Sequence, residues 1–292
     1  MCNTRKGYYM KWLAYLFKIL FRIKALRRYH FGLYQKLFKP YGWFRGLSAV
    51  SRYDKSFRLI VNLEEWIQQH IFFFGMYDIP GINYIKRTLQ PDDVFIDIGA
   101  NVGTYSISAS GCLDKAMGGA VFAFEPVGFI YERLIENIEL NKIDNIHPNK
   151  LGIMDDNKTI ELFLSSKENL GMSSIFHHDT ESGEKEKVEA VKLDDFITDY
   201  DIGKVSVIKI DIEGAEIFAL KGMVNTLKKF RPVLLIEISE NVLRGHTVSE
   251  RDVFNFMRDI GYFPHFIHET GELSPFDIET AEFRTNYVFI PE

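Results

Sequence analysis

One stretch restricts the fold of this chain more than any other: an apolar run at residues 94–98 that leads directly into a glycine-containing turn. The run reads Val-Phe-Ile-Asp-Ile, which indicates a buried strand, and residues 102–109 continue as a helix. Asp97, Gly99 and Gly103 form the pattern Asp-x-Gly-x-x-x-Gly across the turn. Glycine permits a tight turn and lets a ligand approach the backbone, so the sequence predicts a ligand-binding loop at the end of a central strand.

Strand-like and helical segments alternate after this turn. Strands are predicted at 120–124, 146–153, 205–212, 233–238, 262–267 and 286–290, and helices at 129–141, 215–230 and 249–260. A β insertion is predicted at 159–164 and 188–193, with a polar loop at 165–187 between its strands. Alternation of this kind predicts an α/β fold with a mostly parallel sheet and helices on both faces. Before the core, residues 56–90 indicate one or two strands and a helix at 83–89.

Length and composition limit the class of protein. The chain has 292 residues, of which 46% are apolar and 26% charged, as in a globular protein that buries a sizeable core. Its two cysteines, Cys2 and Cys112, are too few for a disulfide framework or a Cys/His zinc site. We therefore expect a reducing, cytoplasmic setting and predict no metal ligands, and metal dependence is left open.

Charge is divided unevenly along the chain. Residues 1–53 contain 12 basic side chains and no acidic one, whereas the remaining 239 residues carry a net charge of −17. A basic extension on an acidic body suggests that the extension has a partner of its own. We predict two parts, a basic amphipathic extension at 1–53 and the main domain at 54–292.

Residues 8–29 of the extension mix apolar and basic side chains. Lys11, Lys18 and Arg22 are spaced by seven and four residues, so they share one stripe of a helix, which we take as part of its polar face. Because Lys18 and Arg22 interrupt the apolar run, we reject a transmembrane span, and the unbroken apolar centre of a signal peptide is absent. Two interpretations remain open: a peripheral helix on an anionic membrane surface at the inner membrane face, or a helix packed on the main domain. No motif supports nucleic-acid binding.

The helix predicted after the glycine turn offers backbone N–H groups that favour an anion. That anion is the methionine carboxylate if the ligand is S-adenosylmethionine, or a pyrophosphate if it is a dinucleotide. The dinucleotide pattern Gly-x-Gly-x-x-Gly is not met, because Asn101 stands where its second glycine is expected. This departure favours the smaller adenosyl ligand over NAD.

Glu125 follows the next predicted strand and is the second feature that indicates an adenosyl ligand. A carboxylate at this edge of a sheet accepts hydrogen bonds from both hydroxyls of a ribose, and Glu125 lies 26 residues after Gly99. The alternative is a surface glutamate that caps the following helix. Pro126 directly behind it restricts the backbone and favours the ribose role.

The third mark is the charged run at 209–216, Lys-Ile-Asp-Ile-Glu-Gly-Ala-Glu, which closes a buried strand. Charged groups beside an apolar strand need a partner or a function. We expect Lys209 to pair with a glutamate and Glu216 to cap a helix. Asp211 is expected to orient a substrate, bind a metal or act as a base, and Glu237 at the end of the next strand is a weaker candidate of the same kind.

In order and number, these motifs resemble the FkbM family of methyltransferases over about residues 74–261. The likeness includes Phe-Gly at 74–75, Asp-Ile-Gly-Ala-Asn-Val-Gly at 97–103, Phe-Glu-Pro at 124–126, Glu-Asn-Ile-Glu-Leu-Asn at 136–141, Gly-Met-Ser-Ser at 171–174, Leu-Asp-Asp-Phe at 193–196, the 209–216 run and Leu-Lys-Gly at 220–222. One departure is Asp155-Asp156, where similar proteins tend to have Gly-Asp, and it affects the adenine side of the site.

The resemblance implies a Rossmann-like class I methyltransferase fold with a seven-stranded sheet, to which the N-terminal helical extension is added. It further implies S-adenosylmethionine as the cofactor and O-methylation of a hydroxyl on a sugar, a glycan or a related metabolite. On this interpretation Asp97, Gly99, Asn101 and Gly103 hold the cofactor, and Glu125 holds its ribose.

Asp211 then faces the methyl acceptor, and His177 and His178, in the loop after Ser173-Ser174, are further candidate bases. Two other functions stay open. An NAD(P)-dependent oxidoreductase on a similar fold is disfavoured by Asn101 and by the absence of a Tyr-x-x-x-Lys motif. A non-catalytic, membrane-associated scaffold is disfavoured because it has no use for an intact glycine loop and Glu125.

Overall fold

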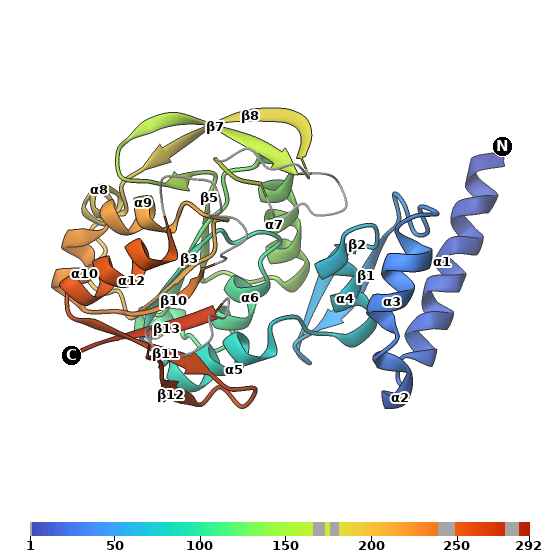
Figure 1. Ribbon diagram of the computed structural model, residues 1–292, viewed down its shortest axis with the longest axis horizontal. Coiled ribbons are helices and arrows are strands. Elements are labelled where there is room, and N and C mark those ends of the chain that lie inside the picture. Colours follow the sequence, from blue (N-terminus) through green and yellow to red (C-terminus); the bar gives the residue numbers. More distant parts are fainter. Residues whose placement is uncertain (1, 166–172, 176–180, 239–248, 278–285) are drawn as a thin grey trace. The chain divides into compact units, whose positions relative to one another are not determined.

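A computed structural model of the chain describes residues 2–165, 173–175, 181–238, 249–277 and 286–292 (Figure 1). The chain divides into two compact units, which we call the N-terminal unit (residues 1–77) and the main unit (residues 78–165 and 171–292). The predicted end of the extension at residue 53 falls inside the N-terminal unit, at the end of one strand of a hairpin.

The N-terminal unit combines helices with one β-hairpin. Its elements are α1 (Cys2–Leu20), α2 (Lys24–Arg27), α3 (His30–Leu33), the π-helical turn η1 (Tyr34–Phe38), β1 (Ser48–Tyr53), β2 (Phe57–Asn62) and α4 (Trp66–Phe74). β1 and β2 pair in antiparallel register. The Glu65 carboxylate begins α4 by accepting hydrogen bonds from the N–H groups of Ile67 and Gln68, at 2.9 and 2.7 Å.

Aromatic rings form much of the core of this unit. The ring of Phe21, directly after α1, has its centroid 5.1 Å from that of Phe73 in α4. His30 stacks on Trp66 with 4.9 Å between ring centroids, and burial lowers the pKa of His30 to about 4. The short helices are therefore held by ring packing more than by their own length.

Lys18 lies on the packed side of α1. Its ammonium group is 4.2 Å from the centre of the Phe72 ring and donates a hydrogen bond to the Ser51 hydroxyl at 3.1 Å. Burial, with Arg22 nearby, lowers the pKa of Lys18. Lys18, predicted on the polar face of this helix, is therefore half-buried, and its charge lies over an aromatic ring of α4.

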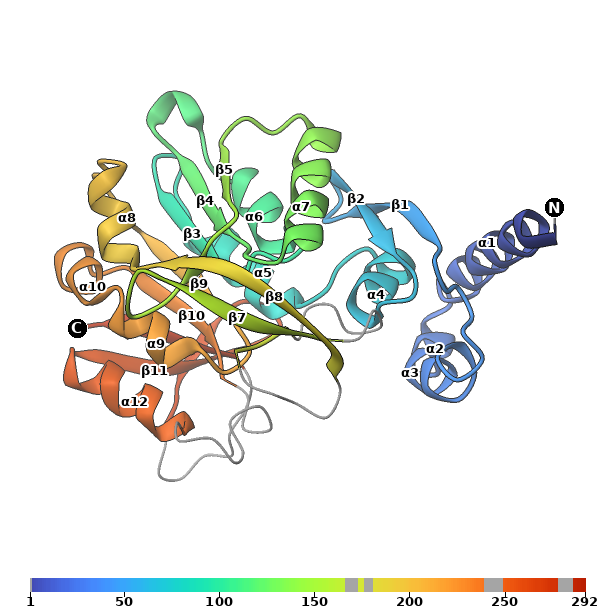
Figure 2. The same ribbon diagram turned by 90° about the horizontal axis from the view of Figure 1, so that it is seen from above.

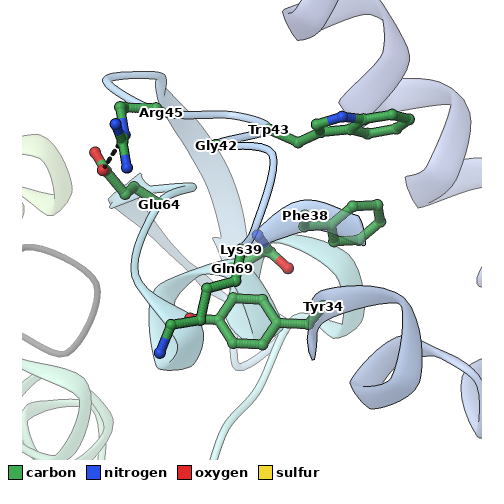
Figure 3. Close-up of a pocket in the computed structure, with 8 residues that line it drawn as sticks. All are labelled: Tyr34, Phe38, Lys39, Gly42, Trp43, Arg45, Glu64 and Gln69. Atoms are coloured by element: carbon green, nitrogen blue, oxygen red, sulfur yellow. Dashed lines mark hydrogen bonds and ion pairs between the residues drawn. The ribbon is translucent and has the colours of Figure 1, made fainter. Parts of the chain in front are cut away.

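A small pocket lies beside η1, where the chain turns toward β1 (Figure 3). Tyr34, Phe38 and Trp43 supply its aromatic wall, and the rings of Phe38 and Trp43 stack with centroids 5.7 Å apart. Arg45 donates a hydrogen bond to Glu64 at 3.1 Å on its polar side. This ion pair joins the turn to the segment before α4.

The main unit is built on an eight-stranded sheet with the order β12-β11-β13-β10-β9-β3-β4-β5. Its strands are β3 (Val94–Ile98), β4 (Ala120–Phe124), β5 (Ile146–Asn149), β9 (Val207–Ile210), β10 (Val233–Glu237), β11 (Tyr262–Ile267), β12 (Leu273–Pro275) and β13 (Asn286–Pro291). β5, β4, β3, β9 and β10 are parallel neighbours. β13 runs antiparallel to both β10 and β11, so β11 points the same way as the parallel strands.

The sheet is thus mostly parallel, as predicted, but it has eight strands instead of seven. The additional strand is β12, which forms a short antiparallel hairpin with β11. Its three residues, Leu273–Pro275, are too few to show the alternating pattern that predicts a strand.

Helices cover both faces of this sheet, as predicted (Figure 2). Its helices are α5 (Ile79–Thr88), α6 (Thr104–Ser110), the 3₁₀ turn η2 (Lys115–Met117), α7 (Gly128–Asn141), α8 (Leu193–Asp199), α9 (Glu216–Lys221), α10 (Val224–Phe230) and α12 (Glu250–Asp259). α5, α6 and α7 lie on one side, and α8, α9, α10 and α12 on the other. Ile96, Ile208 and Ile236 of neighbouring strands share one buried cluster with Leu220 and Met257 of this second group.

The predicted helix at 215–230 is divided into α9 and α10. The division falls at Gly222, where a Cβ atom would lie 1.9 Å from the carbonyl oxygen of Met154. Only glycine therefore lets the two backbones meet at this point.

A three-stranded sheet in the order β6-β8-β7 forms the predicted β insertion. Its strands are β6 (Gly152–Ile153), β7 (Lys158–Ser165) and β8 (Glu181–Val191). Because β8 begins at Glu181, the prediction of a loop over 165–187 was wrong in its second part. Glu184, Lys185 and Lys187 are exposed, so this half of the strand lacks the apolar alternation that predicts a strand.

None of the helices in the described part of the chain combines the length and the apolar character needed to span a membrane.

Candidate active site

The backbone of the turn after β3 lies directly against the backbone of the segment after β9, with no side chain between them. Gly99 has a φ of +79°, and a Cβ atom there would lie 1.9 Å from the carbonyl oxygen of Asp211. Gly103 has a φ of +94°, and its Cβ would lie 2.7 Å from a methyl group of Leu134 in α7. The two glycines of the motif are therefore required both by backbone conformation and by close packing.

Every backbone N–H group from Gly99 to Gly103 donates to an acceptor within the chain. The acceptors are the Phe124 carbonyl for Gly99 and Ala100 (3.0 and 2.9 Å), Glu125 Oε2 for Asn101 (3.0 Å), Asn101 Oδ1 for Val102 (2.7 Å) and the Ala100 carbonyl for Gly103 (2.9 Å). Asn101 adopts a positive φ of 51°, which asparagine tolerates better than most residues. The turn thus presents a fixed backbone surface, and its own N–H groups are not available for an anion.

Glu125 follows β4 and links the glycine turn to the turn between β4 and α7 by hydrogen bonds. Its side chain is buried, and its two carboxylate oxygens accept hydrogen bonds from the N–H groups of Asn101 at 3.0 Å and Val127 at 2.9 Å. Burial raises the pKa of Glu125 to about 7, although both backbone bonds favour the charged form. A carboxylate has about four acceptor positions, so two remain for a pair of hydroxyl groups such as those of a ribose. The position therefore fits the predicted ligand, and Glu125 also has a structural role that the sequence did not indicate.

Lys209 lies at the centre of the buried charges. Its Nζ atom lies 3.1 Å from Asp211 Oδ2 and 3.5 Å from Asp97 Oδ1, and it donates a hydrogen bond to the Gly99 carbonyl at 2.9 Å. Burial alone lowers the pKa of Lys209, but Asp211 and Asp97 outweigh it and raise the pKa above its usual value. The expected pairing with a glutamate was wrong, because the partner from the neighbouring strand is Asp97, which stands opposite Lys209 in the β3–β9 register.

Asp97 is fully buried beneath the turn. Its Oδ2 atom accepts a hydrogen bond from the Ser106 hydroxyl at 2.6 Å, and its Oδ1 atom faces the Lys209 ammonium group without a hydrogen bond. Asp97 therefore has a structural role: it binds Lys209, which contacts the turn, and Ser106 of α6.

Asp211 is the accessible carboxylate of this group. Its side chain is 31% exposed, against 7% for Lys209 and 0% for Asp97. Its N–H group donates to the Ile98 carbonyl at 3.1 Å, and its own carbonyl meets Gly99. The structure thus brings Asp211 directly beside the glycine turn.

Further carboxyl groups lie near the ion pair of Lys209 and Asp211. Burial, together with Asp211, raises the pKa of Glu237 to about 8 and raises that of Glu213. Glu216 is buried, accepts a hydrogen bond from the Gly214 N–H group at 2.9 Å and has its pKa raised to about 7 by burial. Several acids at this edge of the sheet therefore hold protons near neutral pH, while Lys209 carries the opposing charge.

Asp78, Gly81 and Tyr105 complete this edge, and the sequence did not single them out. Asp78 begins α5, and one of its carboxylate oxygens accepts a hydrogen bond from the Tyr105 hydroxyl of α6. A Cβ atom at Gly81 would lie 1.8 Å from that hydroxyl oxygen, and the Lys209 ammonium group lies 5.2 Å from the centre of the Tyr105 ring. The signal was present in Asp-Ile-Pro-Gly at 78–81, since aspartate before an early proline is typical of a helix start.

The remaining sequence candidates are placed only in part. Ser174 donates a hydrogen bond from its hydroxyl to the Glu213 carbonyl at 2.6 Å, which brings this part of the Gly-Met-Ser-Ser motif to the charged run. His177 and His178 lie outside the described residues. Asp155 pairs with Lys158 at 2.8 Å. Among the described side chains, no three histidines, cysteines or acids converge in a way that holds a metal ion.

The fold and this site define the class of protein. The strand order, the glycine turn after the central β3 and the buried acid after β4 are those of a Rossmann-like, S-adenosylmethionine-dependent class I methyltransferase. Residues 97–264 match the Methyltransferase FkbM domain, and the chain belongs to this family. The predictions of the family, the fold class, an enzyme and its cofactor are thereby confirmed.

Individual relatives match more than half of this chain. The hexuronic acid methyltransferase AglP of Haloferax volcanii is 29% identical over 196 residues, which are 67% of this chain and 75% of AglP. Methyltransferase 1 of Beauveria bassiana is 24% identical over 54% of this chain and 67% of its own length. Among solved structures, methyltransferase FkbM from Methylobacillus flagellatus has a TM-score of 0.45 and 18% identity, covering 69% of this chain and 44% of that protein.

Proposed function

We propose that this methyltransferase transfers a methyl group from S-adenosylmethionine to the oxygen of a sugar hydroxyl, with Asp211 as the general base. The observation that carries the proposal is the position of Asp211, which touches Gly99 of the glycine turn while its side chain remains accessible. A sugar acceptor is supported by the relative AglP, whose name states that it methylates a hexuronic acid.

The cofactor supplies a methyl group made electrophilic by its sulfonium, and the chain must hold it in place. Glu125 would accept hydrogen bonds from the ribose hydroxyls at the acceptor positions that the N–H groups of Asn101 and Val127 leave unused. Gly99 and Gly103 give the turn its shape. Asp97 is fully buried, so its contribution is indirect: it pairs with Lys209, which in turn holds the glycine turn.

The chain must also align the acceptor and remove a proton from a weakly acidic hydroxyl. Asp211 takes that proton as the oxygen–methyl bond forms and S-adenosylhomocysteine leaves. The Lys209 ammonium group, 3.1 Å away, fixes the direction of the Asp211 carboxylate. His177 and His178 remain alternative bases from the sequence.

The charges at this edge favour a neutral sugar. Seven carboxyl groups of the described residues lie around the ammonium group of Lys209: Asp78, Asp97, Glu125, Asp211, Glu213, Glu216 and Glu237. A uronate would add another negative charge to this group, which costs energy even when some of the acids are protonated. We expect a hexoside to be methylated faster than the hexuronide that differs from it only in the carboxylate. Equal or faster methylation of the hexuronide would refute this choice of acceptor.

The N-terminal unit has a separate proposed role. Residues 1–53 form the basic extension, and residues 8–29 associate with an anionic membrane surface, which would make the enzyme peripheral to a membrane. The strong positive charge of this part of the chain supports the proposal.

A titration of the protein with S-adenosylmethionine and, separately, with NADH by calorimetry tests the cofactor, and binding of NADH alone would overturn it. For Asp211→Asn we expect methyl transfer to fall about 100-fold or more while cofactor affinity stays within about threefold. Asp92→Asn is the matched control, because Asp92 also pairs with a lysine, at 2.7 Å on the surface. Full activity of Asp211→Asn would show that the base lies elsewhere.

A further inference from the structure

Helix α1 carries apolar side chains on two opposite faces. Ala14, Phe17 and Phe21 follow one another at spacings of three and four, so they share one face. This face is packed: Ala14 and Phe21 are buried, and the Phe17 ring lies 5.2 Å from that of Phe38 between centroids. The packed face accounts for the attachment of α1 to the N-terminal unit and leaves the other face to be explained.

The opposite face has the same spacing but no covering. Trp12, Leu16 and Ile19 recur at spacings of four and three, which places them about half a turn away from the packed face. Trp12 is 66% exposed, Ile19 59% and Leu16 37%. We call these three residues the exposed stripe. The large apolar side chains next to it are exposed as well: Tyr9, Tyr15, Leu20 and Ile23.

Cations lie along one edge of this stripe. Lys11 is exposed on α1, Arg22 is exposed in the turn that follows the helix, and Lys24 begins α2. The whole N-terminal unit, residues 1–77, has fourteen basic residues and only three acids, Asp54, Glu64 and Glu65. Of these, Glu64 is paired with Arg45, and Asp54 and Glu65 are buried. Any partner of the stripe therefore meets an apolar surface with a strongly positive border.

An apolar stripe with a positive border is compatible with some kinds of partner and not with others. A second copy of the chain would bring two borders of like charge together, which opposes self-association through this face. A nucleic acid matches the charge but gives no reason for an exposed tryptophan, leucine and isoleucine on one stripe. An anionic lipid surface matches both features, since apolar side chains enter the boundary of the acyl chains while cations remain at the headgroups.

We propose that α1 docks on anionic lipid with the exposed stripe inserted, Lys11, Arg22 and Lys24 at the headgroups, and the packed face holding the unit behind it. The inference rests on the proposed membrane association and specifies the face, the inserted residues and the kind of lipid. In this arrangement α1 packs within the N-terminal unit through one face and binds lipid through the other.

Co-sedimentation of the full chain with vesicles tests the inference. The vesicles contain either phosphatidylcholine alone or phosphatidylcholine with about 30 mol% phosphatidylserine. Phosphatidylserine gives the second kind of vesicle a negative surface. The variant Trp12→Ala/Leu16→Ala/Ile19→Ala removes the stripe, and Lys11→Gln/Arg22→Gln/Lys24→Gln removes the border. Met117→Ala/Phe263→Ala is the matched control, because both residues are exposed apolar side chains of the main unit.

We expect the wild-type chain and the control to bind the anionic vesicles, and each α1 variant to lose about tenfold or more in partition coefficient. Bromine-labelled acyl chains should quench tryptophan emission in the wild type but much less in Trp12→Phe, which reports insertion directly. Circular dichroism and cofactor titration establish that the α1 variants remain folded.

The other outcomes have distinct meanings. Failure of the wild type to bind vesicles would overturn both the membrane association and the face assigned to it. Binding that survives removal of the stripe but not of the border would retain the association and overturn insertion. Concentration-dependent dimers that the stripe variant abolishes would identify a second copy as the partner, contrary to this inference.

Discussion

Replacing Lys209 with methionine should destabilise the protein strongly. Methionine keeps the length of the side chain and removes the ammonium group that faces Asp97 at 3.5 Å, Asp211 at 3.1 Å and the Gly99 carbonyl at 2.9 Å. Asp211 is partly exposed and regains water, but Asp97 is fully buried and keeps only the Ser106 hydroxyl. The variant therefore contains a buried carboxylate without its cation.

Removing one partner of a buried ion pair costs about 3–5 kcal/mol of the free energy of unfolding. In a domain of this size, that corresponds to a fall in Tm of roughly 10 °C. The second change Asp97→Asn removes the stranded charge and still accepts the hydrogen bond from Ser106, so we expect the double variant to recover more than half of the loss.

Urea denaturation at pH 7.5, followed by circular dichroism, measures both variants against the wild type. Lys204→Met is the matched control, because Lys204 also faces two carboxylates, Asp92 at 2.7 Å and Asp93 at 2.8 Å, but is itself exposed. Asp92 is exposed too, and the buried Asp93 keeps hydrogen bonds from the Gln90 N–H group and the Ser206 hydroxyl. Exposed pairs contribute about 0–1 kcal/mol, so the control should change little. A Lys209→Met variant as stable as Lys204→Met, or a double variant less stable than Lys209→Met, would refute the argument from buried charge.

Three further predictions concern the turn and the buried acids. Gly99→Ala should lose at least about 3 kcal/mol of stability and all cofactor binding, because its Cβ meets the Asp211 backbone, whereas Gly118→Ala, also at positive φ but with open space around it, should lose about 1–2 kcal/mol by thermal denaturation; equal losses would contradict this. Glu125→Gln should weaken S-adenosylmethionine binding by about 10–100-fold in calorimetry, because its amide sets a donor against a backbone N–H group; unchanged affinity would exclude the ribose role. The Tm of the cofactor-free protein should fall as the pH rises from 6.5 to 8.5. The pKa values of Glu216 and Glu237, about 7 and 8, lie above that of an unfolded glutamate, so the stability they give is complete below the unfolded pKa and is lost as the pH passes the folded values. His30 and His70, with pKa values of about 4, act in the opposite direction only below about pH 6.5. Glu216→Gln should reduce the fall, and a Tm that rises over this range would contradict the assignment.

The sequence predicted the centre of the fold well and its edges less well. β3, β4 and β11 have the bounds that the sequence indicated. For β3 the reason is that a strand buried between two layers of helices leaves a continuous apolar signal. α4 (Trp66–Phe74) was not predicted, since its residues are apolar and aromatic on nearly every side and show little helical periodicity. The division at Gly222 depends on a contact with Met154, which no local pattern reveals.

The same distinction applies to the site. Gly99, Glu125 and Asp211 were found in the sequence because each directly follows a recognisable strand, and parallel strands end at one edge of the sheet. The partner of Lys209 was mistaken because pairing across β3 and β9 depends on register, which the sequence alone does not give. Asp78 was missed because α5 starts earlier than its apolar spacing suggested.

The contact of Lys209 with the Gly99 carbonyl also bears on the order in which the protein matures. The two residues are 110 positions apart, so a ribosome has made the glycine motif long before the lysine that completes its surroundings. β9 must then pair with β3 across this long separation before β10 can pair with β9, a long-range event of the kind that is slow in folding. A nascent chain that stops before β9 therefore carries the cofactor motif in its sequence without the cofactor-binding surface, and the enzyme acquires its cofactor only late in its synthesis.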